Sequence, residues 1–200
     1  MKKTRLDDCV CSTHLVDHSL IKDRILLEIE KTFGGKNDVR ESYGANSRIS
    51  KLDWDIAEDF ERPWVKIFLP NFKISIAEML SSMAYSTGMS LVKIWYQQYL
   101  EGNTHEWHIH GNHFTGVYYL EYSKGNGKTE ICSPYSMRTV KLTPKEGDII
   151  IFPAHWIHRG LENGKDRKTI VSYNLDIDAD RLLNTELVNS VNTGKPYIFF

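Results

Sequence analysis

The sequence contains few cysteines and has neither a long apolar run nor an excess of charge of one sign. Its three cysteines, Cys9, Cys11 and Cys132, are an odd and sparse set without a CxxC pair, which argues against a disulfide framework. Sparse cysteine usage is typical of reducing compartments, so we predict a cytoplasmic location. No run of 18 apolar residues occurs, which predicts that no helix crosses a membrane.

Charge and complexity exclude further classes of protein. The formal net charge is −1, so no global field attracts nucleic acid or an anionic membrane. The basic start, residues 1–5, is followed by Leu6-Asp7-Asp8-Cys9 rather than an apolar segment, and we predict no signal peptide. No internal repeat is visible. A length of 200 residues with 41% hydrophobic residues predicts a single domain with a sizeable core.

The pattern of apolar residues divides the chain into three parts. Residues 1–90 predict a helical front, with helices at about Leu20–Phe33 and Phe72–Thr87 that end at glycines. Residues 178–200 predict a closing helix, Ala179–Val191, and a tail. Between them, short strand-like runs alternate with turns rich in Gly, Asn and Pro, which indicates a sandwich or barrel. These runs are residues 91–99, 105–110, 115–122, 138–142, 148–152 and 169–177. The fold class is therefore mainly β with flanking helices.

Histidines gather in one segment of the chain. Six of the eight lie between positions 105 and 158, and four of these fall within nine residues: His105, His108, His110 and His113. In a strand, side chains at i and i+2 share a face, so His108 and His110 point the same way and could bind one metal ion. Glu106 has the same parity. We expect His105 and His113 to lie on the other face or in the turn, and Trp107 and Ile109 to pack in the core.

A second segment could complete the metal site. The apolar strand Ile149–Phe152 is followed by Pro153, which breaks it, and by His158 at the edge of a loop. This histidine is placed to join a site built by another strand, whereas we interpret His155 as a loop residue. Two histidines from one strand and one from another suit a metal centre with open positions.

These motifs together resemble a known family. The order Tyr99–Asn103, Trp107–His110, Gly116–Leu120, Gly147–Phe152, His158 and Arg167-Lys168 is similar to that of the iron(II)/2-oxoglutarate-dependent oxygenases. The likeness covers about residues 91–177, and it is strongest to prolyl-hydroxylase-like members and to uncharacterised bacterial and phage members. The resemblance implies a double-stranded β-helix, or jelly roll, with residues 91–177 as the catalytic core.

The resemblance also assigns the metal ligands. The family's first histidine ligand corresponds to His108 and its distal histidine to His158. The family's second ligand is an aspartate or glutamate two residues after the first histidine, and this chain has His110 there. Three neutral imidazoles would bring no negative charge to the metal. The second ligand is therefore His110, a carboxylate such as Glu106, or water, and we favour His110.

The family binds the far carboxylate of 2-oxoglutarate with a basic residue on the last strand. Here the corresponding window holds Arg167 and Lys168, which point to opposite faces. Lys168 shares its face with Ser172 and Asn174, small polar residues that suit a pocket wall, whereas Arg167 has a planar fork that grips a carboxylate well. The resemblance also places Tyr119 at this carboxylate and Tyr99 in the wall of the cosubstrate pocket.

The implied function is hydroxylation that uses iron(II), 2-oxoglutarate and O2 and releases succinate and CO2. No catalytic residue beyond the metal ligands is expected, since the metal and cosubstrate carry the chemistry. The prime substrate is a small molecule or a protein residue, and no nucleic-acid or membrane partner is indicated. Two alternatives remain: a cupin-type metal enzyme without 2-oxoglutarate, and a non-catalytic jelly-roll binding protein.

Overall fold

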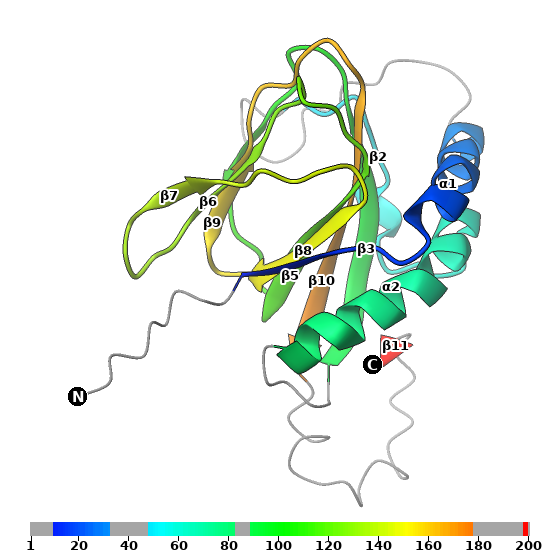
Figure 1. Cartoon of the computed structure of the whole chain (residues 1–200), viewed down its shortest axis with the longest axis horizontal. Helices are drawn as coiled ribbons and strands as arrows, with labels where there is room; N and C mark the ends of the chain where they lie inside the picture. The colour runs from blue at the N-terminus through cyan, green and yellow to red at the C-terminus, as the bar shows by residue number, and fades with distance from the viewer. Residues whose placement is uncertain (1–9, 33–47, 83–88, 178–197, 200) are drawn as a thin grey trace, which may run out of the picture.

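Two antiparallel sheets face each other and form the body of the molecule (Figure 1). The structure, a computed structural model, describes residues 10–32, 48–82, 89–177 and 198–199. Within these residues the larger sheet has the strand order β1-β8-β5-β10-β3-β11, with β2 also paired to β3, and the smaller has the order β4-β9-β6-β7. The strands of the larger sheet are β1 (Cys11–His14), β2 (Lys51–Leu52), β3 (Met89–Tyr99), β5 (Phe114–Glu121), β8 (Asp148–Pro153), β10 (Lys168–Ile177) and β11 (Ile198–Phe199).

The chain passes back and forth between the sheets. The smaller sheet contains β4 (His105–His108), β6 (Thr129–Cys132), β7 (Thr139–Lys141) and β9 (Ile157–Gly160). From β3 to β10, consecutive strands lie in alternate sheets, except for the hairpin β6–β7. This winding is a jelly roll, in which strands distant in sequence become neighbours. It brings β4 beside β9 and puts β10 between β3 and β5.

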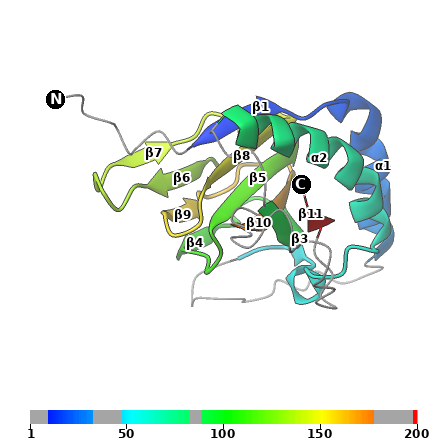
Figure 2. The same cartoon turned by 90° about the horizontal axis from the view of Figure 1, so that it is seen from below.

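Two helices, α1 (His18–Thr32) and α2 (Pro63–Ser82), cover the outer face of the larger sheet (Figures 1 and 2). Ile21, Ile25 and Ile29 repeat at helical spacing on α1 and are buried against the sheet. Helix α2 buries a face that includes Trp64, Phe68 and Phe72. In the described part of the chain, neither helix combines the length and the apolar composition that a bilayer crossing requires.

Helix α2 begins at Pro63, so the prediction that it begins at Phe72 is wrong. Pro70 lies inside the helix, and a proline there removes one hydrogen bond and normally ends the helix. Here the apolar face continues on both sides of it, from Trp64 to Leu80, and its burial outweighs the lost bond. The predicted end of this helix at Thr87 and the predicted helix Ala179–Val191 lie outside the described residues.

The larger sheet separates two cores. The outer core fills the space between the helices and the sheet and contains Tyr118, Val171 and Tyr173. The inner core lies between the two sheets and contains Tyr99, Val117 and Ile170. Alternate residues of one strand therefore enter different cores. The fold confirms the predicted mainly β architecture with flanking helices, although β1, β2, β6, β9 and β11 had not been predicted as strands.

Candidate active site

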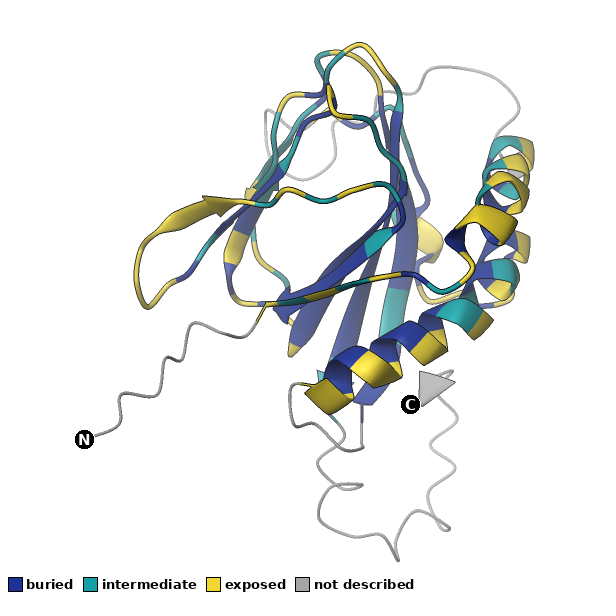
Figure 3. Ribbon diagram, in the orientation of Figure 1, coloured by how far each residue is buried: buried dark blue, intermediate teal, exposed yellow. Residues whose placement is uncertain are grey.

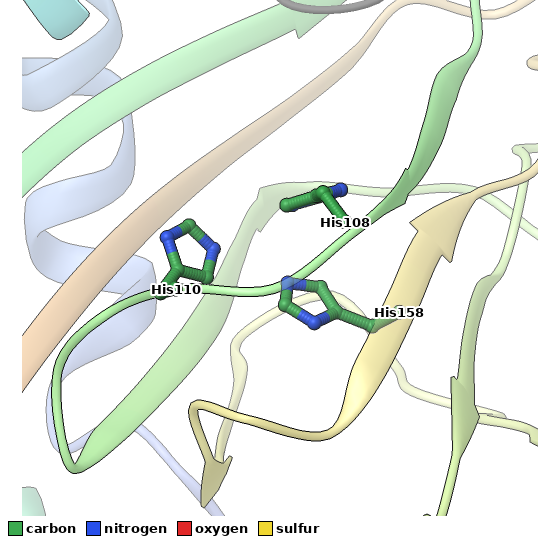
Figure 4. Close-up of side chains that lie close together, drawn as sticks. All are labelled: His108, His110 and His158. Atoms are coloured by element: carbon green, nitrogen blue, oxygen red, sulfur yellow. The ribbon is translucent and has the colours of Figure 1, made fainter.

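Three histidines, two from paired strands and one from the loop that follows β4, converge between the sheets (Figure 4). His108 is the last residue of β4 and stands opposite His158 of β9 in the strand pairing. His110 follows in the next loop, where its backbone N–H donates to the carbonyl of Ala154 at 3.0 Å. Each of the three offers one ring nitrogen, and these nitrogens all lie within 4.8 Å of one another. The jelly-roll pairing of β4 with β9 thus produces a cluster that could hold one metal ion.

Backbone carbonyls orient two of the imidazoles. The Nδ1 atom of His108 lies 2.7 Å from the carbonyl oxygen of Glu106, and the Nδ1 atom of His158 lies 2.9 Å from that of Trp156. A carbonyl oxygen only accepts, so Nδ1 carries the hydrogen in each ring. The lone pair is then on Nε2, which is the atom left for a metal. Such carbonyl bonds are a usual support for metal-binding histidines.

Burial keeps the three rings neutral. Burial lowers the pKa of His158 well below its ordinary value and that of His110 to about 3. Burial likewise lowers the pKa of His108, against the opposing effect of the carbonyl of Glu106. A metal ion requires unprotonated imidazoles, and this cluster supplies them without proton loss at neutral pH.

Among the described residues, no carboxylate belongs to the cluster. Glu106 does not line the cavity beside it, because the pairing of β4 with β9 shifts register between His105 and His108. That irregularity places His105 rather than Glu106 next to His108, with ring centroids 4.0 Å apart. The prediction that His105 lies on the opposite face is therefore wrong.

Trp107 and Ile109 were predicted to pack in the core, and this is also wrong. Trp107 is 38% exposed, with the guanidinium of Arg159 4.4 Å from its ring centroid, and Ile109 is 57% exposed. They alternate with inward-facing histidines along β4 and the residues after it, and neither α1 nor α2 covers the outer face of the smaller sheet (Figure 3). Strand alternation predicted correctly that Trp107 and Ile109 point away from His108. It could not predict whether that opposite face is covered by a second core or exposed to solvent.

A lysine is buried deep between the sheets. Lys168, the first residue of β10, is 2% exposed, and its Nζ donates to the carbonyl of Gly127 at 2.9 Å. The same Nζ lies 4.1 Å from the ring centroid of Tyr99. Burial lowers the lysine pKa to about 7. In the described parts of the chain no carboxylate lies within ion-pair distance of it, which is costly for a buried ammonium group unless an anion joins it.

The other candidate cation is engaged elsewhere. Arg167 donates from Nε to Glu121 at 2.8 Å and from a terminal nitrogen to Glu30 at 2.6 Å. Arg167 lines neither of the two cavities that border the histidine cluster. The structure therefore does not bring Arg167 to the histidines, because adjacent residues of a strand face opposite sides and Arg167 faces α1.

Two tyrosines stand near Lys168. Tyr99 contacts it directly, and its hydroxyl donates to the side-chain oxygen of Gln97 at 3.3 Å. Tyr119 is buried behind the wall, and its hydroxyl donates to Thr129 at 2.8 Å. Thr129 itself lines the small cavity between Lys168 and the histidine cluster, the inner cavity, so Tyr119 reaches that cavity through Thr129.

A cavity of about 30 Å³ links the lysine to the three histidines. Its wall includes Thr129, Ile170 and Ser172 besides Lys168 and the cluster. Ser172 was expected there from its parity with Lys168, whereas Gln97 was not expected. A signal was Gln97-Gln98, two adjacent amides that lie between the aromatic residues Tyr96 and Tyr99. His113 and His155 lie apart from the cluster, next to Asp176 at 3.0 Å and Tyr135 at 3.4 Å.

Comparisons with known proteins were made from sequence and from structure. No family model and no curated protein matches the sequence. A solved epimerase, the non-haem α-ketoglutarate-dependent SnoN from nogalamycin biosynthesis, is similar at a TM-score of 0.65 and 14% identity, covering 86% of this chain and 78% of that chain. The Trichoplax adhaerens prolyl hydroxylase, solved with a peptide of hypoxia-inducible factor, has a TM-score of 0.60 and 16% identity over 89% and 88% of the two chains.

A third neighbour is the prolyl-4-hydroxylase of Pseudomonas putida, with a TM-score of 0.58 and 13% identity over 84% of this chain and 92% of that chain. This chain has the fold of these enzymes. The double-stranded β-helix expected from residues 91–177 is confirmed, and the likeness covers 84–89% of the chain, more than that segment alone. At such low identity the comparison shows the fold, and the function has to be argued from the site.

Proposed function

We propose that the protein is an iron(II)- and 2-oxoglutarate-dependent oxygenase that hydroxylates its substrate and releases succinate and CO2. One observation carries the proposal: a three-histidine cluster and a buried lysine without a carboxylate partner among the described residues face the same cavity. Metal ligands alone suit many enzymes. A metal site beside a cation that requires an anion specifies a ligand with a chelating end and a distant carboxylate.

The donor set fits the proposed metal. His108, His110 and His158 offer neutral imidazoles from two directions, and the carbonyl bonds of two of them leave Nε2 available. Imidazole is a good ligand for iron(II), and three protein ligands leave positions for a chelating cosubstrate and O2. When bound there, iron(II) together with O2 and the keto acid supplies the oxidising power for hydroxylation.

Lys168 would bind the far carboxylate of 2-oxoglutarate. At low dielectric the ammonium–carboxylate bond is strong, and the incoming anion would raise the lysine pKa back toward its ordinary value. The carbonyl of Gly127 and the ring of Tyr99 hold the ammonium group in position. An added Cβ at Gly127 would clash with the backbone oxygens of Leu161 and Glu162, so only glycine brings this carbonyl close.

The cupin alternative leaves Lys168 without a function. A cupin-type enzyme that does not use 2-oxoglutarate needs the histidines but has no use for a desolvated cation on the same cavity. A purely binding jelly roll likewise has no use for three neutral imidazoles, two of which are oriented by backbone carbonyls. The fold of the solved neighbours, two prolyl hydroxylases and an α-ketoglutarate-dependent epimerase, supports the oxygenase.

The test is anaerobic titration of the protein with iron(II) and then with 2-oxoglutarate. We expect a visible metal-to-ligand charge-transfer band that requires both additions. His108→Ala and His158→Ala should abolish it. Lys168→Met should move its half-saturation to about 100-fold higher 2-oxoglutarate, because a buried charge partner is lost.

Arg167→Gln is the matched control, since it removes the adjacent cation that faces away from the cavity. It should leave the half-saturation within about twofold, a change too small for a lost charge pair. Absence of the band in the unaltered protein would refute the oxygenase, and succinate formation without the band's dependence on Lys168 would refute the assigned carboxylate site.

A further inference from the structure

A second and larger cavity opens on the other side of the histidines. Its volume is about 500 Å³, which is in the range of small-molecule sites. It shares five lining residues with the inner cavity, namely Trp95, Gln97, His105, His108 and His110. A molecule held there would lie against the metal cluster, beside a 2-oxoglutarate that extends from the cluster into the inner cavity toward Lys168. The larger cavity is thus the place for the prime substrate, a statement that rests on the proposed function.

Flat apolar groups form one wall of this cavity. Trp54 of the short helix η1 (Trp54–Ile56) meets Trp95 of β3 edge to face, with ring centroids 4.4 Å apart. Ile49 and Leu52 continue the wall. Two indoles at a right angle present one ring face and one ring edge, a pair that suits an aromatic guest.

An unsatisfied acceptor lies in the same wall. Asn174 of β10 is 1% exposed, and its side-chain oxygen has no hydrogen-bond partner within the described residues. A buried amide oxygen without a partner is costly, and native structures seldom keep one without a function. It lies on the face of β10 that carries Lys168 and Ser172. A ligand that donates an O–H or N–H at this point would satisfy it.

One cation stands next to that acceptor. Lys93 is the cross-strand neighbour of Asn174, and its Nζ lies 4.8 Å from the ring centroid of Trp54. Its ion pair with Glu58, at 3.5 Å, involves a carboxylate that is 68% exposed, so it is weak. The residues that line the cavity include no aspartate or glutamate. The charge balance therefore favours an anionic group and disfavours a cationic one.

We infer that the prime substrate is a small planar molecule that carries both a hydrogen-bond donor and an acidic group. The ring would lie against Trp54 and Trp95, the donor would bond to Asn174, and the acid would pair with Lys93. The donor and the acid belong on the same side of the substrate, because Asn174 and Lys93 are paired across β10 and β3. A peptide is the competing class of substrate. The residues that line the cavity include no aspartate or glutamate that could pair with a basic side chain of a peptide.

The test uses four probes on the anaerobic iron(II)–2-oxoglutarate protein, with binding measured by calorimetry. The probes are 3-hydroxybenzoate, benzoate without the donor, phenol without the acid, and cyclohexanecarboxylate without the planar ring. We expect 3-hydroxybenzoate to bind most tightly, and each omission to weaken binding about fivefold, the effect of one hydrogen bond or weak ion pair.

Two variants assign each contact. Asn174→Leu keeps the side-chain volume and removes the acceptor. It should weaken the binding of 3-hydroxybenzoate about fivefold and leave the affinity for benzoate unchanged. Lys93→Met should weaken both acids and leave phenol unchanged. Lys66→Met is the charge control, since Lys66 of α2 forms an exposed pair with Glu61, which precedes the helix. It should change none of the affinities.

The inference is overturned if no probe binds, if phenol or cyclohexanecarboxylate binds as tightly as 3-hydroxybenzoate, or if Asn174→Leu weakens benzoate equally. Each of these results leaves the charge-transfer band of iron(II) and 2-oxoglutarate untouched. Loss of that band is a failure of the proposed function instead, so the two failures are distinguishable.

Discussion

The two faces of strand β10 are equally buried but chemically opposite. On the outer face Val171, Tyr173 and Leu175 are fully buried beneath the helices. The inner face presents Lys168, Ile170, Ser172 and Asn174, all at most 6% exposed. The outer face follows the usual rule that burial selects apolar groups. The inner face departs from it at three of these four positions.

This difference separates stability from function within one element. Burial of apolar groups on the outer side favours folding, whereas burial of a lysine and an unsatisfied amide disfavours it. A folded protein retains buried polar groups of this kind when a bound ligand supplies their missing partners. The inner face of β10 borders both cavities, where such ligands would bind. Substitutions on the two faces should therefore move different observables.

The largest effect should come from the outer core. Phe68 on α2 is fully buried and stacks on Tyr118 at a centroid distance of 5.0 Å. Phe68→Ala should lower the free energy of unfolding by about 3–5 kcal/mol, through lost transfer energy and the cavity left behind. Denaturant unfolding measures it, and iron(II) affinity of the folded protein should stay the same.

Leu20→Ala is the matched control on the helical layer. Leu20 is 70% exposed on α1, so the substitution should change the free energy of unfolding by less than about 0.5 kcal/mol. If Phe68→Ala were no more destabilising than this control, the assignment of stability to the outer core, and of ligand binding to the inner face of β10, would be wrong.

The inner face should show the reverse behaviour at Lys168. Lys168→Met replaces an unpaired buried ammonium group with an apolar side chain of similar length, so the ligand-free protein should be as stable as the original or up to about 2 kcal/mol more stable. Thermal unfolding without 2-oxoglutarate checks this. A clear loss of stability would show that the lysine serves the fold, through its bond to Gly127.

The pH dependence should sharpen the same point. The pKa of Lys168 is lowered from 10.5 to about 7 by burial. Above pH 7 the lysine must take up a proton to bind a carboxylate, so 2-oxoglutarate affinity should fall by up to about tenfold per pH unit between pH 7 and 9. Calorimetry in buffers of different ionisation enthalpy would detect the proton, and its absence would contradict the assignment.

The stability of the ligand-free protein should depend on pH in the opposite direction to the 2-oxoglutarate affinity. Between pH 7 and 10.5 the unfolded chain holds a proton on this lysine that the folded, ligand-free chain does not. The free energy of unfolding contributed by Lys168 therefore rises with pH over that window. Lys168→Met should remove this slope.

The smallest effect should be at Tyr119. Its hydroxyl reaches the inner cavity only through Thr129, at 2.8 Å. Tyr119→Phe should therefore weaken 2-oxoglutarate by only about two- to fivefold, the value of one neutral hydrogen bond. A loss as large as that of Lys168→Met would mean that Tyr119 contacts the carboxylate directly.

Several features of the site were predictable from residue spacing. The i, i+2 relation of His108 and His110 and their pairing with a distant histidine correspond to the observed cluster. The alternation of side chains along the last strand predicted that Lys168 and Arg167 point to opposite faces, as they do in the structure. The start of α2 was not predictable, because Pro70 reads as a helix break until the packing of its neighbours is known. Nor was the irregularity in β4 that turns His105 inward, since it depends on pairing with β9.

The cytoplasmic location, the division of the domain at residues 90 and 177, and the roles of the site residues stay predictions. Lys168 and the three histidines are nevertheless brought together in the structure, and this juxtaposition is what the experiments above address.

By itself, the sequence determined which residue types are available and, where a strand is regular, on which side each one points, because alternation is a local property of the extended backbone. Only the tertiary structure decided what each side meets. Whether Trp107 faces a core or solvent, and whether Asn174 finds a partner, depends on which distant strand or helix packs there, and that is settled by the fold as a whole.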